Sequence, residues 1–270
     1  MQWADESLRI TFLGTRGGIV ARRRGHFRHS SLLVSHRGHR LLIDAGADWL
    51  GALERVGPEA IVVTHAHPDH VGGLAQGAPC SVYATAATWR SMPRFPIAAR
   101  QRRILRPGRR HRIAGLTVEP FPVQHSLRAP AVGLRIAAGG ARLFYVPDVL
   151  SIPHCARALR GVQLYVGDGA AILRSVVRGR GAKSIGHASI RTQLGWCVSH
   201  EVAQALFTHC GSEIVAGDER SACRRVRRLA RAAGVPADLA RDGSSVVVGE
   251  GARHCGSKPA ASRPAARARG

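Results

Sequence analysis

The sequence lacks the apolar stretches that mark membrane and secreted proteins. No run approaches the roughly 20 apolar residues that a membrane-spanning helix needs, and residues 1–9, which include Asp5 and Glu6, have no apolar signal-peptide core. The six cysteines are scattered without a Cys-x-x-Cys pair, which argues against a disulfide framework and against a cysteine-based zinc site. We therefore expect a cytoplasmic protein that has no membrane partner.

Lysine and acidic side chains are also scarce. The chain has 40 basic and 17 acidic residues, and because only Lys183 and Lys258 are lysines, arginine supplies most of the net charge of +23. A surface of this kind attracts phosphates and would serve a nucleic-acid or nucleotide substrate. Coding composition explains the bias toward arginine equally well, since the arginines are spread along the chain. Charge alone leaves both interpretations open.

The hydrophobic content and the pattern of predicted helices and strands indicate one folded domain. Of the 270 residues, 45% are hydrophobic, which is enough for a large core within residues 1–250. Residues 251–270 contain no acidic residue and predict a disordered basic tail. Helix-like stretches cover residues 48–56, 189–201 and 219–233, and residues 36–39 predict a hairpin turn. Short apolar runs predict strands at residues 10–13, 31–34, 41–43, 61–63, 82–83, 117–123, 143–146, 164–166 and 206–207. This pattern favours sheets covered by helices.

Polar side chains follow the predicted strands at the points where the strands end. In α/β proteins such positions converge on one edge of a sheet, where the loops build the active site. The residues in these positions are Asp44, His65, His125, Asp148, Asp168, His187 and His209.

The segment His65-Ala66-His67-Pro68-Asp69-His70 follows directly after an apolar strand. Histidine and carboxylate are the usual ligands of Zn²⁺ and similar ions. A tight loop with this spacing directs two imidazoles at one metal, and a carboxylate with a third imidazole at a second metal. A lone histidine here would indicate only an exposed turn, whereas four donors in this pattern favour a metal site.

This segment resembles the His-x-His-x-Asp-His signature of the metallo-β-lactamase superfamily, and residues 11–15, 43–46, 124–126, 147–148 and 208–210 resemble its other motifs. The resemblance implies an α/β fold, an αββα four-layer sandwich with two divalent metal ions at one edge. It implies that one ion is bound by His65, His67 and His125, and the other by Asp69, His70 and His209. Asp148 would bridge the two ions. Zn²⁺ is the default for such ligands, with Mn²⁺ or Fe²⁺ as alternatives.

Two such ions roughly 3.5–4 Å apart lower the pKa of a bridging water and supply hydroxide at neutral pH. The resemblance implies that Asp69 orients this hydroxide while it binds metal. Asp44 would accept hydrogen bonds that fix a ligand or the motif loop, although a strand-end cap explains Asp44 equally well. Because the superfamily hydrolyses β-lactams, lactones, thioesters, sulfates and phosphodiesters, the fold does not fix the substrate.

Two further motifs favour a phosphodiester. Gly186-His187-Ala188-Ser189 resembles a motif of ribonuclease Z and of the phosphoribosyl cyclic phosphate phosphodiesterases. This implies that His187 protonates the leaving group or stabilises the phosphoryl oxygen. Asp168 resembles the acidic partner of that histidine, and residues 12–18 and 28–31 also resemble this branch. The simpler alternatives are a helix N-terminal residue for His187 and a turn residue for Asp168.

The basic loop at residues 22–29 adds candidate substrate ligands, namely Arg24, Arg28 and His29. A solvated loop is the alternative. Only 23 positions separate His125 from Asp148, which is too few for the tRNA-gripping insertion of ribonuclease Z. We therefore expect a phosphodiesterase for a small cyclic or nucleotide phosphodiester. The alternatives are a ribonuclease Z-type RNA-processing endonuclease, a lactone or thioester hydrolase, and a nucleic-acid-binding protein on an inactive fold, and a homodimer is compatible with each of these.

Overall fold

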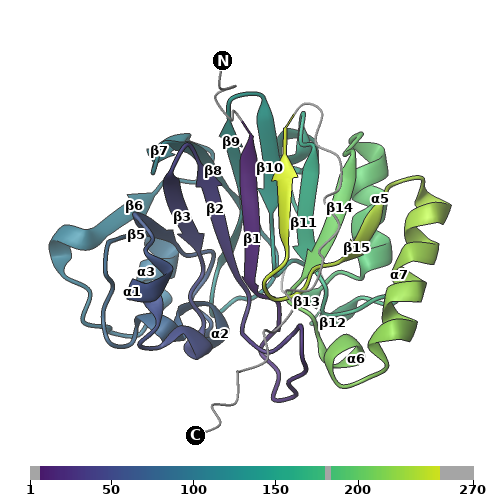
Figure 1. The fold of residues 1–270 in the computed structure, drawn as a ribbon, viewed down its shortest axis with the longest axis horizontal. Coiled ribbons are helices and arrows are strands. Elements are labelled where there is room, and N and C mark those ends of the chain that lie inside the picture. The colour runs from purple at the N-terminus through teal and green to yellow at the C-terminus, as the bar shows by residue number, and fades with distance from the viewer. Residues whose placement is uncertain (1–6, 180–183, 250–270) are drawn as a thin grey trace, which may run out of the picture.

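The computed structural model describes residues 7–179 and 184–249. Two sheets stand at the centre of the molecule, and helices lie on both outer sides (Figure 1). The predicted basic tail at residues 251–270 lies outside the described residues, as does the greater part of the N-terminal segment at residues 1–9.

The first sheet has seven strands in the order β16-β1-β2-β3-β4-β5-β6. Its pairing is antiparallel from β16 to β3 and parallel from β3 to β6. The predicted hairpin turn joins β2 to β3, where Arg37 (φ 49°) and Gly38 (φ 83°) have the positive φ angles of a tight hairpin turn. The strands are β1 (Leu8–Gly14), β2 (Ser31–His36), β3 (His39–Ile43), β4 (Ala60–Val62), β5 (Ser81–Thr85), β6 (Arg102–Leu105) and β16 (Ser245–Val248).

The second sheet has seven strands in the order β15-β14-β11-β10-β9-β8-β7. Its pairing is antiparallel from β7 to β10 and parallel from β10 to β15. A separate two-stranded ribbon consists of β12 (Val176–Arg178) and β13 (Ile185–His187). The strands of the second sheet are β7 (His111–Ile113), β8 (Leu116–Val123), β9 (Ala131–Ala138), β10 (Ala141–Tyr145), β11 (Leu164–Asp168), β14 (Gln204–Thr208) and β15 (Ala237–Leu239).

Alternating apolar residues explain why the two sheets stack. Successive side chains of a strand point to opposite faces, so Leu41 and Ile43 of β3 enter the core between the sheets, while Leu42 packs under the helices of the first sheet. In the second sheet, Leu143 faces the core between the sheets and Phe144 packs under the helices on the other side. Three buried clusters therefore separate four layers, and the predicted αββα sandwich is confirmed.

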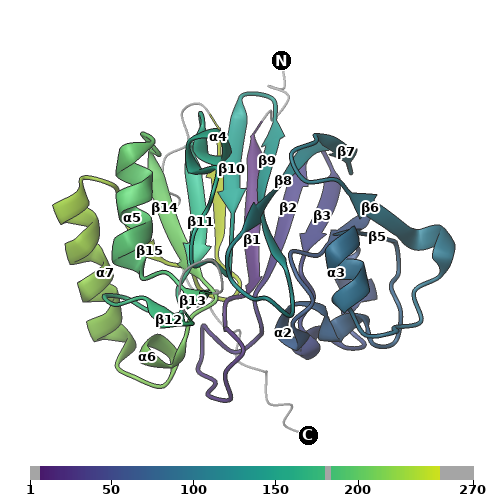
Figure 2. The same cartoon turned by 180° about the vertical axis from the view of Figure 1, so that it is seen from behind.

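The helices cover the two outer faces. Beside the first sheet are α1 (Leu53–Val56), α2 (Pro68–Val71) and α3 (Ala86–Ser91), and beside the second are α4 (Cys155–Leu159), α5 (Ile190–Ser199), α6 (Ser212–Val215) and α7 (Glu219–Ala233). Figure 2 shows α4 and α5 against the second sheet from behind. No helix in the described ranges is long and apolar enough to cross a membrane.

Two of the three predicted helices are present as expected, and the prediction of the third is wrong in part. Ser189 caps α5, with its hydroxyl accepting a hydrogen bond from the Thr192 amide at 3.2 Å, and α7 covers its predicted range. The predicted helix at residues 48–56 is instead a 3-10 turn at Ala47–Trp49 followed by the single turn of α1. Gly51 separates them because its φ of 69° is incompatible with a right-handed helix.

Two exposed glycines allow a test of how the backbone contributes to stability. Gly195 lies inside α5 and Gly234 follows α7 with a φ of 70°, and a Cβ atom at either position would meet nothing within 4 Å. We expect Gly195→Ala to raise the free energy of unfolding by about 1 kcal/mol, because alanine favours the helix. Gly234→Ala should lower it by about 1 kcal/mol, because an L-residue is strained at positive φ. Urea unfolding measures both, and shifts of the same sign would contradict this explanation.

Candidate metal centre

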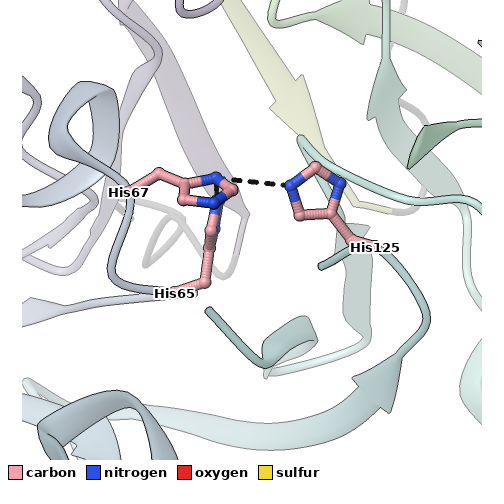
Figure 3. Close-up of side chains that lie close together, drawn as sticks. All are labelled: His65, His67 and His125. Atoms are coloured by element: carbon pink, nitrogen blue, oxygen red, sulfur yellow. Dashed lines mark hydrogen bonds between the residues drawn. The ribbon is translucent and has the colours of Figure 1, made fainter. Parts of the chain in front are cut away.

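Three imidazoles meet at one point between the two sheets. His65 follows β4, His67 precedes the first turn of α2, and His125 follows β8. Nε2 of His65 lies 3.0 Å from Nδ1 of His67, which in turn lies 3.4 Å from Nε2 of His125. Figure 3 shows the three ring nitrogens facing one another. Since the His125 Nδ1–H donates to the carbonyl oxygen of Gly186 at 3.1 Å, its Nε2 presents a lone pair to this point.

Asp69, His70 and His209 form a second group beside the first. Oδ2 of Asp69 lies 3.1 Å from Nε2 of His209 and 3.5 Å from Nε2 of His70. Asp148 lies between the two groups: its Oδ2 is 2.7 Å from Nε2 of His70 and 3.2 Å from Nε2 of His209. Its Oδ1 is 3.5 Å from Nε2 of His125. The structure thus brings together all seven residues that the sequence predicted as metal ligands.

The chemistry of these atoms fits divalent cations. Nε2 of His70 and Oδ2 of Asp148 are buried and face each other at 2.7 Å, but neither forms a hydrogen bond of regular geometry among the described residues. Burying such atoms without a partner is unfavourable, and a cation between them would satisfy both. The donor set of imidazoles and carboxylates is the one that binds Zn²⁺ and related ions.

The charges in the cluster keep the carboxylates ionised. Burial opposes the charged form of Asp148, but His209, His125 and His70 hold the pKa of this carboxyl well below its usual range. Burial likewise opposes the charged form of His209, yet Asp148, Asp168 and Asp69 raise its pKa to about 10. The second group contains Asp69, and Asp148 lies between the two groups, so each group has a carboxylate beside or within it that can offset the charge of a bound cation.

Local backbone structure explains how one short segment supplies four donors. Pro68 starts α2 directly after His67, because its missing N–H and fixed φ suit the first turn of a helix. The amides of His70 and Val71 then donate to the carbonyl oxygen of His67, at 2.9 and 3.0 Å. This turn carries Asp69 and His70 to the second group while His65 and His67 remain in the first.

A family model described as a beta-lactamase superfamily domain matches residues 39–210, which is more than half of the chain. This chain belongs to the metallo-β-lactamase superfamily. The matched range includes both groups of candidate ligands. The curated sequence relatives of the chain include ribonuclease Z proteins. The ribonuclease Z of Methanopyrus kandleri is 30% identical over 147 residues, which cover 49% of this chain and 51% of that protein.

The chain spans about half or less of the length of the curated relatives that it matches. Solved structures match over a larger range. The metallo-β-lactamase fold protein YhfI of Bacillus subtilis has a TM-score of 0.70 at 15% identity and covers 90% of this chain and 99% of its own. A diphosphatase of the PhnP family has a TM-score of 0.65 at 21% identity, with coverages of 89% and 97%. At these identities the structural likeness shows the fold alone.

Outer partners orient the ligands of this superfamily site. The carboxylate of Asp44 accepts hydrogen bonds from Nδ1 of His70 at 2.9 Å and from the Thr64 hydroxyl at 2.8 Å, which turns Nε2 of His70 toward Asp148. Asp44 (φ 59°) and His209 (φ 51°) both have left-handed backbone conformations, which are uncommon for residues other than glycine. Such strain is typical of functional sites where surrounding contacts fix the backbone.

His187 lies beside the cluster at the end of β13 and is held by Asp168. Its Nδ1 donates to Oδ2 of Asp168 at 2.7 Å and lies 3.5 Å from Oδ1 of Asp148. Burial opposes the protonated imidazole, but Asp168 raises the pKa of His187. The amides of Val149 and Ala170 also donate to the Asp168 carboxylate. His187 is thus fixed in orientation, although it is still 23% exposed.

The basic loop at residues 22–29 lies at the same edge of the sandwich as the cluster (Figure 1). Its side chains, however, mostly contact the protein itself. His29 pairs with Asp48 at 2.8 Å, and burial and the charge of Arg16 lower its pKa to about 4. Arg28 stacks on the Trp49 ring at 4.4 Å, while Arg24 is exposed. His29 is therefore a neutral, anchored residue, and of the three predicted substrate ligands only Arg24 and Arg28 offer a positive charge to a substrate.

Two glycines contact the candidate ligands directly, a role that the sequence reasoning did not assign to them. A Cβ atom on Gly17 would lie 3.0 Å from Cε1 of His209, and one on Gly18 would lie 2.9 Å from Oδ2 of Asp69. The backbone at residues 17–18 therefore packs directly against the candidate metal centre. A side chain at either position would displace His209 or Asp69. The adjacent glycines in the motif at residues 12–18 indicated a close approach of the backbone, but only the fold shows which ligands they contact.

We expect Asp44→Asn to weaken metal binding about 10- to 100-fold, because it removes the charge that orients His70. Competition with a chromophoric chelator measures this affinity. Glu59→Gln is a matched control, since Glu59 also pairs with a histidine, His39 at 2.9 Å, but on the surface. Equal metal affinity in Asp44→Asn and the parent protein would contradict an orienting role for Asp44.

Proposed function

We propose that this metal-dependent hydrolase is a phosphodiesterase that acts on a small cyclic or nucleotide phosphodiester. The observation that carries the proposal is the His187–Asp168 pair, held at 2.7 Å beside the candidate metal ligands. A carbonyl substrate such as a lactone has no phosphoryl oxygen for this imidazole to stabilise. A phosphodiester provides such an oxygen and, like a lactone, a leaving alkoxide that needs a proton.

Each side chain has a role in this proposal. The two groups of ligands would hold two divalent ions, with zinc favoured by the many imidazoles, and these ions would supply an activated water and stabilise negative charge. Asp69, which is 14% exposed, accepts a hydrogen bond from the attacking water and orients it. The Nδ1–H of His187 donates a hydrogen bond to Asp168 throughout, and the protonated Nε2 of His187 gives its proton to the leaving oxygen.

The sequence comparisons support phosphorus-centred chemistry, because they include several ribonuclease Z sequences. The structure supports a small substrate. The whole interval between His125 and Asp148 is taken up by the β9–β10 hairpin and its connections, so no inserted arm for tRNA leaves the sheet there. Arg24 and Arg28 remain candidates for contacts with the rest of the substrate.

The first test is the substrate class. The purified protein should contain about two equivalents of divalent metal. It should hydrolyse bis-p-nitrophenyl phosphate and lose that activity on chelation. A panel of lactones and thioesters, assayed side by side, provides the comparison. Turnover of the lactones with no turnover of any phosphodiester would contradict the proposal while leaving the metal centre intact.

The second test separates proton donation from simple stabilisation of the phosphoryl oxygen. We expect His187→Ala to lower kcat about 10²- to 10⁴-fold on a ribonucleoside 2′,3′-cyclic phosphate, whose leaving alkoxide needs a proton. The loss should be far smaller on bis-p-nitrophenyl phosphate, whose leaving group departs without one. The metal content should not change, and His154→Ala, which removes an exposed histidine, serves as the control. Equal losses on both substrates would exclude His187 as the acid.

A further inference from the structure

A second concentration of charge lies far from the candidate metal centre. A hollow of about 510 Å³ is lined by five arginines and one carboxylate, that of Glu119. We call it the arginine pocket, and its arginines are Arg110, Arg135, Arg142, Arg157 and Arg160. One negative charge against five positive charges leaves a large local excess that the pocket itself does not neutralise.

The pocket and the metal centre lie at opposite ends of the second sheet. Glu119 and His125 are six residues apart along one nearly continuous extended segment, so at about 3.3 Å per residue they are separated by roughly 20 Å. Figure 2 shows α4, which carries Arg157, at the upper ends of β10 and β11, whereas β13, which carries His187, lies below their lower ends. A small ligand in the pocket therefore cannot contact the metal ligands.

Glu119 fixes two of the guanidinium groups in place. Its Oε2 accepts a hydrogen bond from Arg135 at 2.5 Å, and its Oε1 accepts one from Arg157 at 2.8 Å. Burial disfavours the charged carboxylate, but Arg135 and Arg157 lower the pKa of Glu119, so it stays ionised. Both guanidinium groups also stack over the Phe121 ring, at 5.1 and 5.5 Å.

Carbonyl oxygens complete this support. Arg135 donates to the carbonyl oxygen of Arg157 at 2.7 Å, and Arg157 donates to that of Gly108 at 2.8 Å. Side chains that are already ordered lose little conformational entropy when a ligand binds. Two of the five cations of the pocket, Arg135 and Arg157, are thus held in place before a ligand binds.

Arg142 and Arg160 add charge that has no acidic partner. Both are exposed, and within residues 7–179 and 184–249 neither forms an ion pair with a carboxylate. Arg110 is 76% exposed and lies 3.7 Å from Glu119. These three guanidinium groups can therefore turn toward a ligand without breaking a strong internal contact.

We propose that the arginine pocket binds ligands that carry neighbouring phosphate groups, as a site distinct from the metal centre. The planar guanidinium group binds phosphate oxygens in pairs, which a compact ammonium group does not. The volume is within the range of about 300–1,000 Å³ that is typical of small-molecule sites. The excess of charge selects ligands with several negative charges. A free polyphosphate and the successive phosphodiesters of an RNA strand both provide this chemistry.

The test compares two double variants of the full-length, metal-loaded protein. Arg142→Gln with Arg160→Gln removes two charges from the pocket but leaves the contacts of Glu119 intact. Arg100→Gln with Arg228→Gln removes two exposed charges elsewhere, so both variants have the same net charge. Inorganic tripolyphosphate and a short single-stranded RNA are titrated separately by calorimetry at physiological salt. The pocket variant should bind at least about ten-fold more weakly than the parent protein, and the control variant should be nearly unchanged.

The two ligands identify the source of the phosphates. Selective loss of tripolyphosphate binding indicates a free polyphosphate, and selective loss of RNA binding indicates an RNA backbone. Hydrogen exchange provides the location: the bound ligand should protect residues 138–142 and 155–160 more than residues 64–70. Absence of binding, binding that survives in the pocket variant, equal weakening in both variants, or protection confined to residues 64–70 would each overturn the proposal.

Discussion

The burial of ionisable side chains around Asp148 is the constraint on which the rest of the site depends. Imidazoles and carboxylates are held here within hydrogen-bonding range of one another, at nearly complete burial. Removing such groups from water is unfavourable unless each finds a partner. The fold supplies some partners from outside, such as Asp44 for His70, but at the centre Nε2 of His70 and Oδ2 of Asp148 face each other without a hydrogen bond of regular geometry among the described residues. Divalent cations at this point would join the two sheets through ligands from both.

Much of this arrangement could be predicted from the sequence because strand ends are predictable. Alternating or continuous apolar residues mark β3, β4, β8, β10, β11 and β14, and a parallel or mixed sheet brings the ends of its strands to one edge. Their order along the chain then indicated which polar residues would meet. The structure brings those side chains together, and the binding of metal by them stays a prediction until it is measured.

Other features depend on contacts that no local pattern contains. The helix predicted at residues 48–56 is broken at Gly51, where Trp49 and Leu53 pack into the cluster under the first sheet. The basic loop suggested a phosphate-binding surface, but Asp48, from a segment about twenty residues further on, pairs with His29 and with Arg22. β6 (Arg102–Leu105) has too many arginines to indicate a strand from sequence, and only its edge position allows them to point into solvent.

Within the described residues, the ribbon of β12 and β13 forms a two-stranded sheet of its own, separate from both seven-stranded sheets. Its links to the sandwich include hydrogen bonds from the Gly186 amide to the carbonyl oxygen of His125 and from the Ala188 amide to that of Val149. The residue that we propose distinguishes phosphodiester from carbonyl chemistry, His187, therefore stands on a ribbon outside both sheets, and Gly186 of the same ribbon accepts the hydrogen bond that orients His125. Exchange of residues in this ribbon other than Gly186 would redirect the reaction while the sandwich and its ligands stay unchanged. One scaffold can in this way diversify its chemistry without refolding its core.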